Sequence, residues 1–342
     1  MNNPLVSINL VVYNEENRIR RVLKSVLSQK YQNKEILVFD NNSNDKTRDI
    51  IEKEFIIQGV KLYKADKNFC FGPGQNRAAK MTTGKYIVGV SADIIMAENF
   101  IEEMVRSMES DSKIGALQAK IKHITREGVK MNTIDTTGFE IYKSRRLINR
   151  GHGEEDKGQY EIAGEIFSYE GAVPIWRREA FLDCSISLGY TLTESFEAHD
   201  EDFWWMSDDI DLGWRMNLFG WKNFYDPNVL AWHERQTTQK LSSSKLNFIH
   251  MRKNIRNDKK MLDILNYRLT IIKNDFSISL LKNIIPFLKR EIMLFIYFLF
   301  FEQSTLLAYP KIIAKIPKML KKRAYIMKHK KRTREEMEVW FK

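Results

Sequence analysis

The first 120 residues alternate short runs of β-branched apolar residues with amphipathic helical stretches, and this alternation limits the possible folds most. Val6–Val12 predicts a buried strand, and Arg18–Leu27 predicts a helix with one apolar face. Further strands are expected over 35–39, 60–63 and 86–90, and further helices over 46–55, 77–81 and 94–108. Strands that alternate with helices predict an α/β fold with a parallel, doubly wound sheet.

The rest of the chain divides into three stretches. Residues 120–170 carry scattered glycine and charge and are expected to be an excursion with loops. Gly171–His233 returns to strand, helix and strand, and beyond about Leu241 the pattern is helical and basic. We therefore expect an α/β unit over 1–240 and a helical region over 241–342.

Charge is unevenly distributed along the chain, whose formal net charge is +11. Residues 240–342 hold 24 Lys and Arg against 8 Asp and Glu, whereas residues 1–239 hold 31 basic against 36 acidic residues. A basic tail predicts a polyanionic partner, either a membrane surface or a nucleic acid. No nucleic-acid-binding module accompanies the charge, which favours an anionic membrane over nucleic acid. A helical bundle with a solvated basic face is the alternative.

The two cysteines cannot form a disulfide framework. Cys70 and Cys184 are far apart in the sequence, and neither has a partner at metal-ligand spacing. The apolar run Val6–Tyr13 is too short for a secretory signal and has no basic leader. These features predict a reducing, cytoplasmic setting.

Two aspartates directly follow predicted strands. Asp40 follows the strand at 35–39, and Asp93 follows the strand at 86–90. Ligands of doubly wound sheets bind at the carboxyl ends of the strands, so both side chains should reach one crevice. The alternatives are a turn residue for Asp40 and the N-cap of a helix over 94–108 for Asp93.

A glycine-containing segment precedes the helix expected at 77–81. Gly72 and Gly74 would let the backbone approach a ligand, and Arg77 could contact phosphate. The segment lacks the third glycine of a dinucleotide fingerprint and the Lys-Ser/Thr of a P-loop, which disfavours dehydrogenases and P-loop NTPases. A plain turn is the alternative.

The densest acidic cluster lies at Asp208 and Asp209, with Asp211 nearby. Acids in the first turn of a helix favour the helix dipole, which is a purely structural explanation. It does not explain the alternation of acids and aromatic residues over 200–206, which suits a sugar-binding wall. A partly desolvated carboxylate has a raised pKa and can act as a general base. His233 ends a later apolar run and is either structural or a metal ligand.

Taken together, these motifs resemble glycosyltransferase family 2 over residues 5–240. Val6–Glu15 resembles the first strand of that family, and 35–43 its second-strand motif. Residues 84–93 resemble the strand that ends in the D-x-D metal motif, and 171–215 the acceptor-side block. The resemblance implies the GT-A fold: a Rossmann-like, mostly parallel sheet flanked by helices, followed here by a basic amphipathic helical region.

The resemblance also implies roles for individual residues. The nucleotide-sugar half would be 1–120 and the acceptor half 121–240, with Asp209 as catalytic base and Asp93 and His233 as metal ligands. Candidate nucleotide-sugar ligands are Val12, Tyr13, Asn14, Glu15, Asp40, Asn42, Asn76, Arg77, Ser91 and Ala92. Candidate acceptor ligands are Gly171, Ala172, Trp204, Trp205 and Asp208.

The mechanism implied by the resemblance is a single displacement with inversion at the anomeric carbon. Asp209 would deprotonate an acceptor hydroxyl, while Mn²⁺ or Mg²⁺ would neutralise the departing nucleoside diphosphate. Ser91 replaces the first acid of D-x-D, so Asp93 becomes the main metal candidate. Asp208 replaces the glutamate of the family's E-D pair.

The tail has no simple transmembrane pattern. The longest uncharged apolar run, Ile292–Phe301, is about half of the roughly 20 residues that span a bilayer. Lys311–Lys331 mixes apolar residues with many basic ones, which is typical of helices lying in the membrane interface. The tail resembles rhamnosyltransferase-like members of family 2, and this implies a glycan or polyprenyl-linked acceptor and a peripheral position on the cytoplasmic face of the membrane. The sequence does not give the oligomeric state.

Two other functions remain open at this point. A sugar nucleotidyltransferase would also use a nucleotide site and a metal, but it needs a glycine-rich N-terminal loop that Val6–Arg18 lacks. A non-catalytic membrane-surface protein that binds glycans or nucleotides is the other alternative. Slow, metal-dependent hydrolysis of a nucleotide sugar would distinguish a catalyst from a binding protein.

Overall fold

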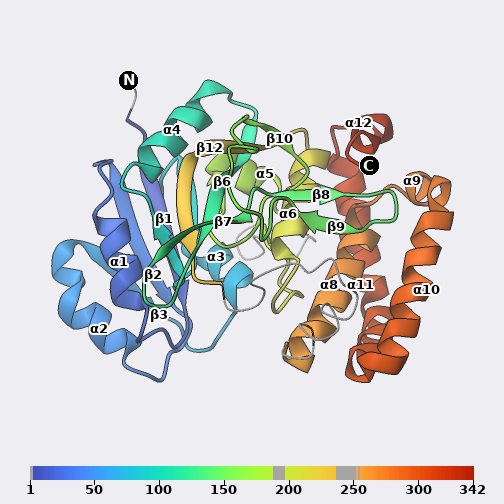
Figure 1. Cartoon of the computed structure of the whole chain (residues 1–342), viewed down its shortest axis with the longest axis horizontal. Coiled ribbons are helices and arrows are strands. Elements are labelled where there is room, and N and C mark those ends of the chain that lie inside the picture. Colours follow the sequence, from blue (N-terminus) through green and yellow to red (C-terminus); the bar gives the residue numbers. More distant parts are fainter. Residues whose placement is uncertain (1–2, 188–196, 236–251, 253–254) are drawn as a thin grey trace.

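The structure is a computed structural model, which describes residues 3–187, 197–235, 252 and 255–342 (Figure 1). Its main sheet has ten strands in the order β10-β12-β6-β11-β4-β1-β2-β3, with β5 beside β12 and β7 beside β6. The strands are β1 (Val6–Val12), β2 (Lys34–Asp40), β3 (Val60–Lys64), β4 (Tyr86–Val90), β5 (Ile94–Met96), β6 (Ile114–Ile124), β7 (Lys130–Thr136), β10 (Gly164–Ile166), β11 (Ile175–Arg177) and β12 (Lys222–His233). β8 (Phe139–Ile141) and β9 (Leu147–Asn149) form a separate hairpin.

The N-terminal half is the predicted α/β unit. β3, β2, β1 and β4 are parallel, and β1 is buried along its whole length. The connecting helices are α1 (Ile19–Leu27), α2 (Thr47–Glu54), α3 (Phe71–Lys80) and α4 (Phe100–Ser110). The predicted class is therefore confirmed: a mixed α/β fold with a mostly parallel sheet and flanking helices.

The helix expected at 77–81 is longer than predicted. α3 begins at Phe71, so Gly72 and Gly74 lie inside its first turns and do not form a turn before it. A Cβ at Gly74 would lie 2.7 Å from Cγ1 of Val11, and one at Gly72 would lie 2.9 Å from Oδ2 of Asp208. These glycines therefore allow α3 to pack closely against β1 and the acidic cluster.

Residues 94–108 do not form one helix. Ile94–Met96 is strand β5, which pairs antiparallel with β12, and α4 starts only at Phe100. The alternative that Asp93 caps a helix is therefore wrong. Ile94 and Met96 are buried β-formers, and their burial in the sheet overrides the helical periodicity.

The prediction that residues 120–170 are an excursion with loops is also wrong in part, because strands run through residues 114–166. β6 pairs with β12 in parallel and with β7 in antiparallel orientation. The turn between β6 and β7 contains Gly128 with φ +90°, a conformation that glycine adopts readily. Alternation of residues along these strands was the signal that could have revealed them.

The chain continues with α5 (Arg178–Asp183) and α6 (Asp208–Leu218) and leads to the helical tail. The tail comprises α8 (Asn257–Asn274), α9 (Ser277–Lys282), α10 (Ile284–Phe301), η2 (Gln303–Leu307), α11 (Ala308–His329) and α12 (Arg334–Glu338). In Figure 1 these helices stand beside the sheet, with α8 and α11 nearer to it than α10. Among the helices described, none is long and apolar enough to cross a membrane.

The tail is packed onto the rest of the chain. α8 and α11 share a hydrophobic cluster, and Tyr267 and Ile326 extend from it into the cluster around α6. Near the end of the chain, Phe341 bridges Ile141 of β8. Of the apolar residues predicted to place Lys311–Lys331 in a membrane interface, Ile312, Met319 and Ile326 are buried in this packing, whereas Ile313 and Leu320 are exposed.

Candidate functional site

Asp93 and His233 come together at the carboxyl ends of β4 and β12. β12 lies between β5 and β6, and His233 is in register with Ile94, the residue after Asp93. His233 Nε2 lies 3.3 Å from Asp93 Oδ2. The pair supplies one nitrogen and one carboxylate, a donor set that suits a divalent cation.

The two side chains perturb each other's protonation. Burial would lower the pKa of His233, but Asp135 and Asp93 outweigh it and raise that pKa to about 10. Burial would raise the pKa of Asp93, but His233 outweighs it and the net shift is downward. Asp93 Oδ1 is buried without a hydrogen-bond partner among the described residues. An aspartate oxygen left unpaired beside a histidine nitrogen fits a bound cation.

Asp135, at the end of β7, was missed by the sequence reasoning. Its carboxylate is fully buried and accepts a hydrogen bond from Nδ1 of His233 at 2.8 Å. This bond turns Nε2 of His233 toward Asp93. Burial would raise the pKa of Asp135, but Arg235 and His233 hold it well below the ordinary range. Asp135 therefore orients His233 and favours its protonated form.

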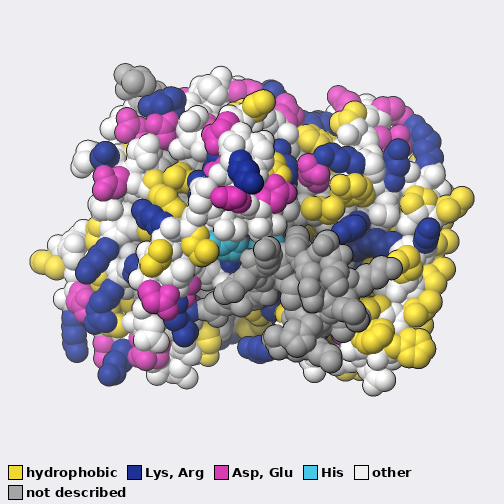
Figure 2. Space-filling model, in the orientation of Figure 1, with side chains coloured by type: hydrophobic (Ala, Val, Ile, Leu, Met, Phe, Trp, Pro, Cys, Tyr) yellow, Lys and Arg dark blue, Asp and Glu magenta, His cyan; other side chains and the backbone are white. Residues whose placement is uncertain are grey.

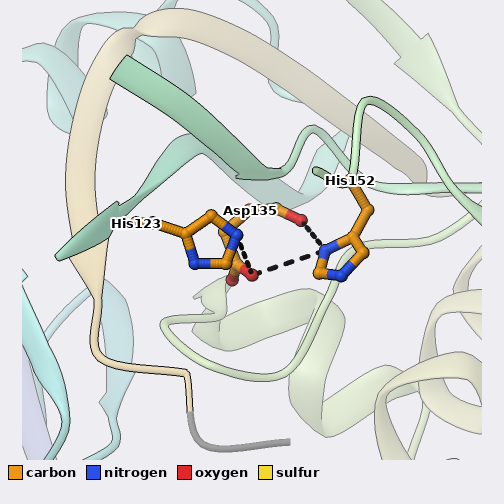
Figure 3. Close-up of side chains that lie close together, drawn as sticks. All are labelled: His123, Asp135 and His152. Atoms are coloured by element: carbon orange, nitrogen blue, oxygen red, sulfur yellow. Dashed lines mark hydrogen bonds and ion pairs between the residues drawn. The ribbon is translucent and has the colours of Figure 1, made fainter. Parts of the chain in front are cut away.

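Asp135 is also the centre of a second group. His123 of β6 and His152, which follows β9, approach the same carboxylate (Figure 3). One ligand atom from each of His123, Asp135 and His152 lies within 4.8 Å of the other two, so this trio could hold a metal. However, Arg235 Nε lies 2.5 Å from Asp135 Oδ1, the oxygen that the two histidines face. A cation in the trio would have to displace that guanidinium.

Asp209 lies in the first turn of α6, as predicted. Its Oδ2 accepts a hydrogen bond from the Gly171 amide at 2.9 Å. Burial first, then the charges of Asp208 and Glu170, raise its pKa well above the ordinary value. A Cβ at residue 171 would lie 3.2 Å from the same oxygen, so glycine permits this close approach.

A short backbone segment links Asp209 to the Asp93 loop. Gly171 bonds to Asp209, and the carbonyl of the next residue, Ala172, accepts from the Ser91 amide at 3.1 Å. The Glu170 carboxylate binds Arg235 at 2.7 Å, which connects the segment to Asp135 as well. The predicted base and the predicted metal ligands are thus held by one continuous network.

Asp208 contributes to this electrostatic environment. Burial first, and the nearby acids Asp211 and Glu170, raise its pKa to about 6. Its Oδ2 lies 3.6 Å from Nδ1 of His199. Burial lowers the pKa of His199 to about 3, so this histidine is neutral and does not pair with the acid as an ion.

The residues predicted to bind nucleotide at the end of β1 meet the end of β2. Val12 pairs with Asp40, and the Asn14 and Glu15 amides donate to Ser43 and Thr47. Tyr13 is exposed. Asp93 is among the charges that raise the pKa of Glu15, although burial is the first cause. These residues therefore border the Asp93 loop.

Asp40 is fully buried and already has partners. Its carboxylate accepts from the Ser43 amide and from Arg48 Nε, and Arg48 also contacts Asn42 at 3.2 Å. A buried carboxylate needs such partners. The structure thus shows the turn role of Asp40 directly, and its nucleotide role stays a prediction.

Asn76 and Arg77 bind the segment that precedes α6. The Asn76 side chain bonds to both backbone groups of His199 at 2.8 and 2.9 Å. Arg77 pairs with Glu201 at 2.8 Å and lies over the ring of Phe69. Their role in binding the donor stays a prediction.

The acidic and aromatic residues before α6 do not form a continuous wall. Asp200 is fully buried, where Lys273 of α8 and Lys322 of α11 bind its carboxylate. Phe203 is buried as well, whereas Trp204 and Trp205 are exposed. The prediction that these acids face a sugar is therefore wrong for Asp200. The two tryptophans remain accessible.

Part of the chain is similar to a known protein family. Residues 7–173 match the family model described as glycosyl transferase family 2. The chain is 23% identical over 229 residues to a poly-beta-1,6-N-acetyl-D-glucosamine synthase of Staphylococcus epidermidis, which covers 66% of the chain and 49% of the relative. The chain thus spans about half the length of the curated relatives it matches.

Two solved structures share the fold. The mannosyltransferase PcManGT of Pyrobaculum calidifontis, crystallised with GDP-Man and Mn²⁺, has a TM-score of 0.52 at 14% identity and covers 95% of this chain and 86% of its own. S. aureus TarS 1-349, crystallised with UDP-GlcNAc, has a TM-score of 0.52 at 15% identity and covers 98% and 92%. By the matched family model, residues 7–173 belong to glycosyltransferase family 2, and the solved structures share the GT-A fold of the chain.

Proposed function

We propose that this chain transfers a sugar from a nucleotide-diphosphate sugar to an acceptor hydroxyl with inversion at the anomeric carbon. The observation that carries the proposal is the network that joins Asp209 to the Asp93 and His233 pair through residues 170–172. A partly desolvated carboxylate with a raised pKa suits proton abstraction, and the aspartate–histidine pair suits a cation. The aspartate–histidine pair lies at the carboxyl ends of β4 and β12, and Asp209 lies in the first turn of α6.

Each residue has a defined part in the proposed reaction. Asp209 accepts the proton of the attacking hydroxyl, and the Gly171 amide holds its carboxylate in place. Asp93 and His233 would hold Mn²⁺ or Mg²⁺, which neutralises charge on the leaving diphosphate when bound. Asp135 keeps His233 Nε2 directed at Asp93. Asp208 lies beside the base and is proposed to contact the acceptor.

The donor and acceptor are proposed from chemistry and similarity together. The curated relatives are named as poly-N-acetylglucosamine synthases, and TarS was crystallised with UDP-GlcNAc, so UDP-GlcNAc is the first donor to test. GDP-mannose is the second, after PcManGT. We propose a glycan or polyprenyl-linked acceptor, at the cytoplasmic face of a membrane, because the tail is strongly basic.

The direct test combines binding with turnover. A specific donor raises the melting temperature with Mn²⁺ or Mg²⁺ present, since a ligand that binds only the folded state stabilises it. We expect one nucleotide sugar to do so and to be hydrolysed slowly only when metal is added. Stabilisation without hydrolysis or transfer would favour the non-catalytic binding protein. Formation of a nucleotide sugar from nucleoside triphosphate and sugar phosphate would favour a nucleotidyltransferase.

Replacing His233 by Ala tests which group holds the cation. We expect His233→Ala to abolish the increase in UDP or GDP affinity that Mn²⁺ causes in the unmodified protein, measured by titration calorimetry. Asp135→Asn should weaken Mn²⁺ binding by about 10–100-fold, since partners of metal-ligating histidines have effects of this size. Mn²⁺ binding should also release a proton, because the pKa of His233 is about 10 in the metal-free protein.

His152→Ala is the matched control, since His152 contacts Asp135 but is remote from Asp93 in the hydrogen-bond network. In His152→Ala, the increase in nucleotide affinity that Mn²⁺ causes should stay within a few fold of that in the unmodified protein. The opposite pattern, with Mn²⁺ binding lost in His152→Ala and kept in His233→Ala, would place the cation in the trio around Asp135.

A further inference from the structure

The outer side of α10 carries a stripe of exposed apolar side chains. Its members recur every three or four residues, the spacing that places side chains on one face of a helix. The α10 face consists of Ile285, Leu288, Ile292, Phe295, Ile296 and Leu299, of which Ile285 is 79% exposed. Figure 2 shows hydrophobic side chains along the edge of the molecule where α9 and α10 lie.

This face is unpartnered because α10 packs on the tail with its other side. Phe298 is buried in the cluster shared by α8 and α11, and Leu294 packs against it. Phe295 lies at the border of the face: its ring centroid is 5.6 Å from that of Tyr309, and its side chain is still 46% exposed. Exposed apolar patches of this kind mark interaction sites with proteins or membranes.

Charge indicates which partner covers the α10 face. Lys282, Lys289 and Lys311 are exposed near its ends. Glu291 of α10 pairs with Arg268, and Glu302, which follows α10, pairs with Arg252. An anionic lipid surface complements this pattern, whereas a second copy would bring two basic edges together.

We propose that the α10 face is a membrane-docking surface, which lies in the acyl–headgroup boundary of an anionic bilayer with α10 parallel to the membrane plane. The apolar side chains enter the lipid, and the lysines contact the anionic headgroups. The proposal deepens the proposed function by naming the membrane-contacting element. It gives that role to α10, where exposed apolar side chains form one face, whereas Ile312, Met319 and Ile326 of α11 are buried and Ile313 and Leu320 are exposed.

Vesicle co-sedimentation tests the proposal with the full chain and no nucleotide sugar. We expect binding to vesicles of phosphatidylglycerol and phosphatidylcholine, and weak binding to phosphatidylcholine alone. Ile292→Glu with Ile296→Glu should reduce the bound fraction by about tenfold or more, because two charges enter the lipid-facing stripe. Lys289→Glu with Lys311→Glu should remove most of the preference for anionic lipid.

The matched control places the same charge on exposed apolar residues elsewhere. Ile57→Glu with Ile162→Glu alters side chains that are 89% and 87% exposed and lie outside the tail. This control should bind vesicles like the unmodified protein. All variants should have the melting temperature of the unmodified protein. Equal vesicle binding by Ile292→Glu/Ile296→Glu would overturn the proposal. So would a concentration-dependent dimer in sedimentation that this variant abolishes while vesicle binding is absent.

The outcome is separable from that of the transfer reaction. Donor-dependent stabilisation and hydrolysis are measured on protein in solution, and vesicle binding is measured without donor. If one of these two results is not obtained, the other can therefore still be interpreted.

Discussion

Asp209→Asn is expected to lower kcat for sugar transfer by about 10²–10⁴-fold, the usual contribution of a positioned general base. The amide keeps the shape of the side chain and can still accept from Gly171, but it cannot take the hydroxyl proton. Donor affinity should change little, because the Asp93 and His233 pair is untouched. Steady-state transfer rates and calorimetric donor affinity, measured on the same preparation, check the expectation.

The pH dependence and a control variant sharpen this test. The raised pKa of Asp209 means that its proton leaves only well above the ordinary range of aspartate, so kcat/KM should fall as the pH drops through that raised pKa. This fall of kcat/KM at low pH, the acid limb of the profile, should be absent in Asp209→Asn. Asp226→Asn, a change on β12 outside the network, should keep both the rate and the limb. Substantial turnover by Asp209→Asn would contradict the base assignment.

Lys322→Ala is expected to produce the largest loss of stability, about 3–5 kcal/mol, because removing one partner of a buried ion pair leaves an uncompensated charge. Lys322 is fully buried in α11 and binds Asp200 at 2.5 Å and Asp202 at 2.9 Å. Lys273 of α8 binds Asp200 and also Asp211, at 2.8 Å. Urea unfolding followed by circular dichroism gives the free energy of unfolding.

Two further measurements identify the cause of this loss. Lys321→Ala removes an exposed neighbouring lysine and should change the free energy of unfolding by about 0.5 kcal/mol or less. Adding Asp200→Asn to Lys322→Ala should recover part of the loss, since it removes one of the buried acids that Lys322 neutralised while Lys273 keeps its pair with Asp211. A loss in Lys322→Ala no larger than that in Lys321→Ala would show that this ion pair does not hold the tail.

The same lysines give the protein an acid-sensitive element. Burial would raise the pKa of Asp200, but Lys273 and Lys322 outweigh it and the net shift is downward. A carboxylate with a depressed folded-state pKa stabilises the fold above its unfolded value, and that stability is lost as the pH falls toward the folded value. Acidification should therefore weaken the attachment of α8 and α11.

The sequence predicted the elements that depend on local pattern. β1 was visible as a short apolar run that is buried along its whole length, and α1 was visible because its periodicity of 3.6 matches its burial. Asp209 was singled out because a long spaced block surrounds it. The rule that ligands bind at strand ends placed Asp40 and Asp93 correctly after β2 and β4. The family and the fold class are confirmed, and the rhamnosyltransferase-like subgroup stays a prediction.

The missed features depend on contacts between distant residues. Asp135 acts on His233 across 98 positions, and neither residue carries a local sign of the other. Lys273 and Lys322 looked like part of a solvated basic region, yet they neutralise acids near residue 200. Ile94–Met96 was assigned to a helix over 94–108, and its pairing with β12 decided its conformation. Such pairings are set by tertiary packing, which a single sequence does not encode in its local pattern.

The position of β12 has a consequence for how the chain acquires its structure. β12 fills the gap between β6 and β5, yet it follows β6 by about 100 residues. Until it is synthesised, the edge of β6 stays open, and open strand edges can pair with other chains. Insertion of β12 also brings His233 to Asp93, so the same late step that closes the sheet completes the proposed metal site. Nucleotide binding in the presence of Mn²⁺ should therefore appear only when folding is finished, and it can serve as a kinetic probe of that last step.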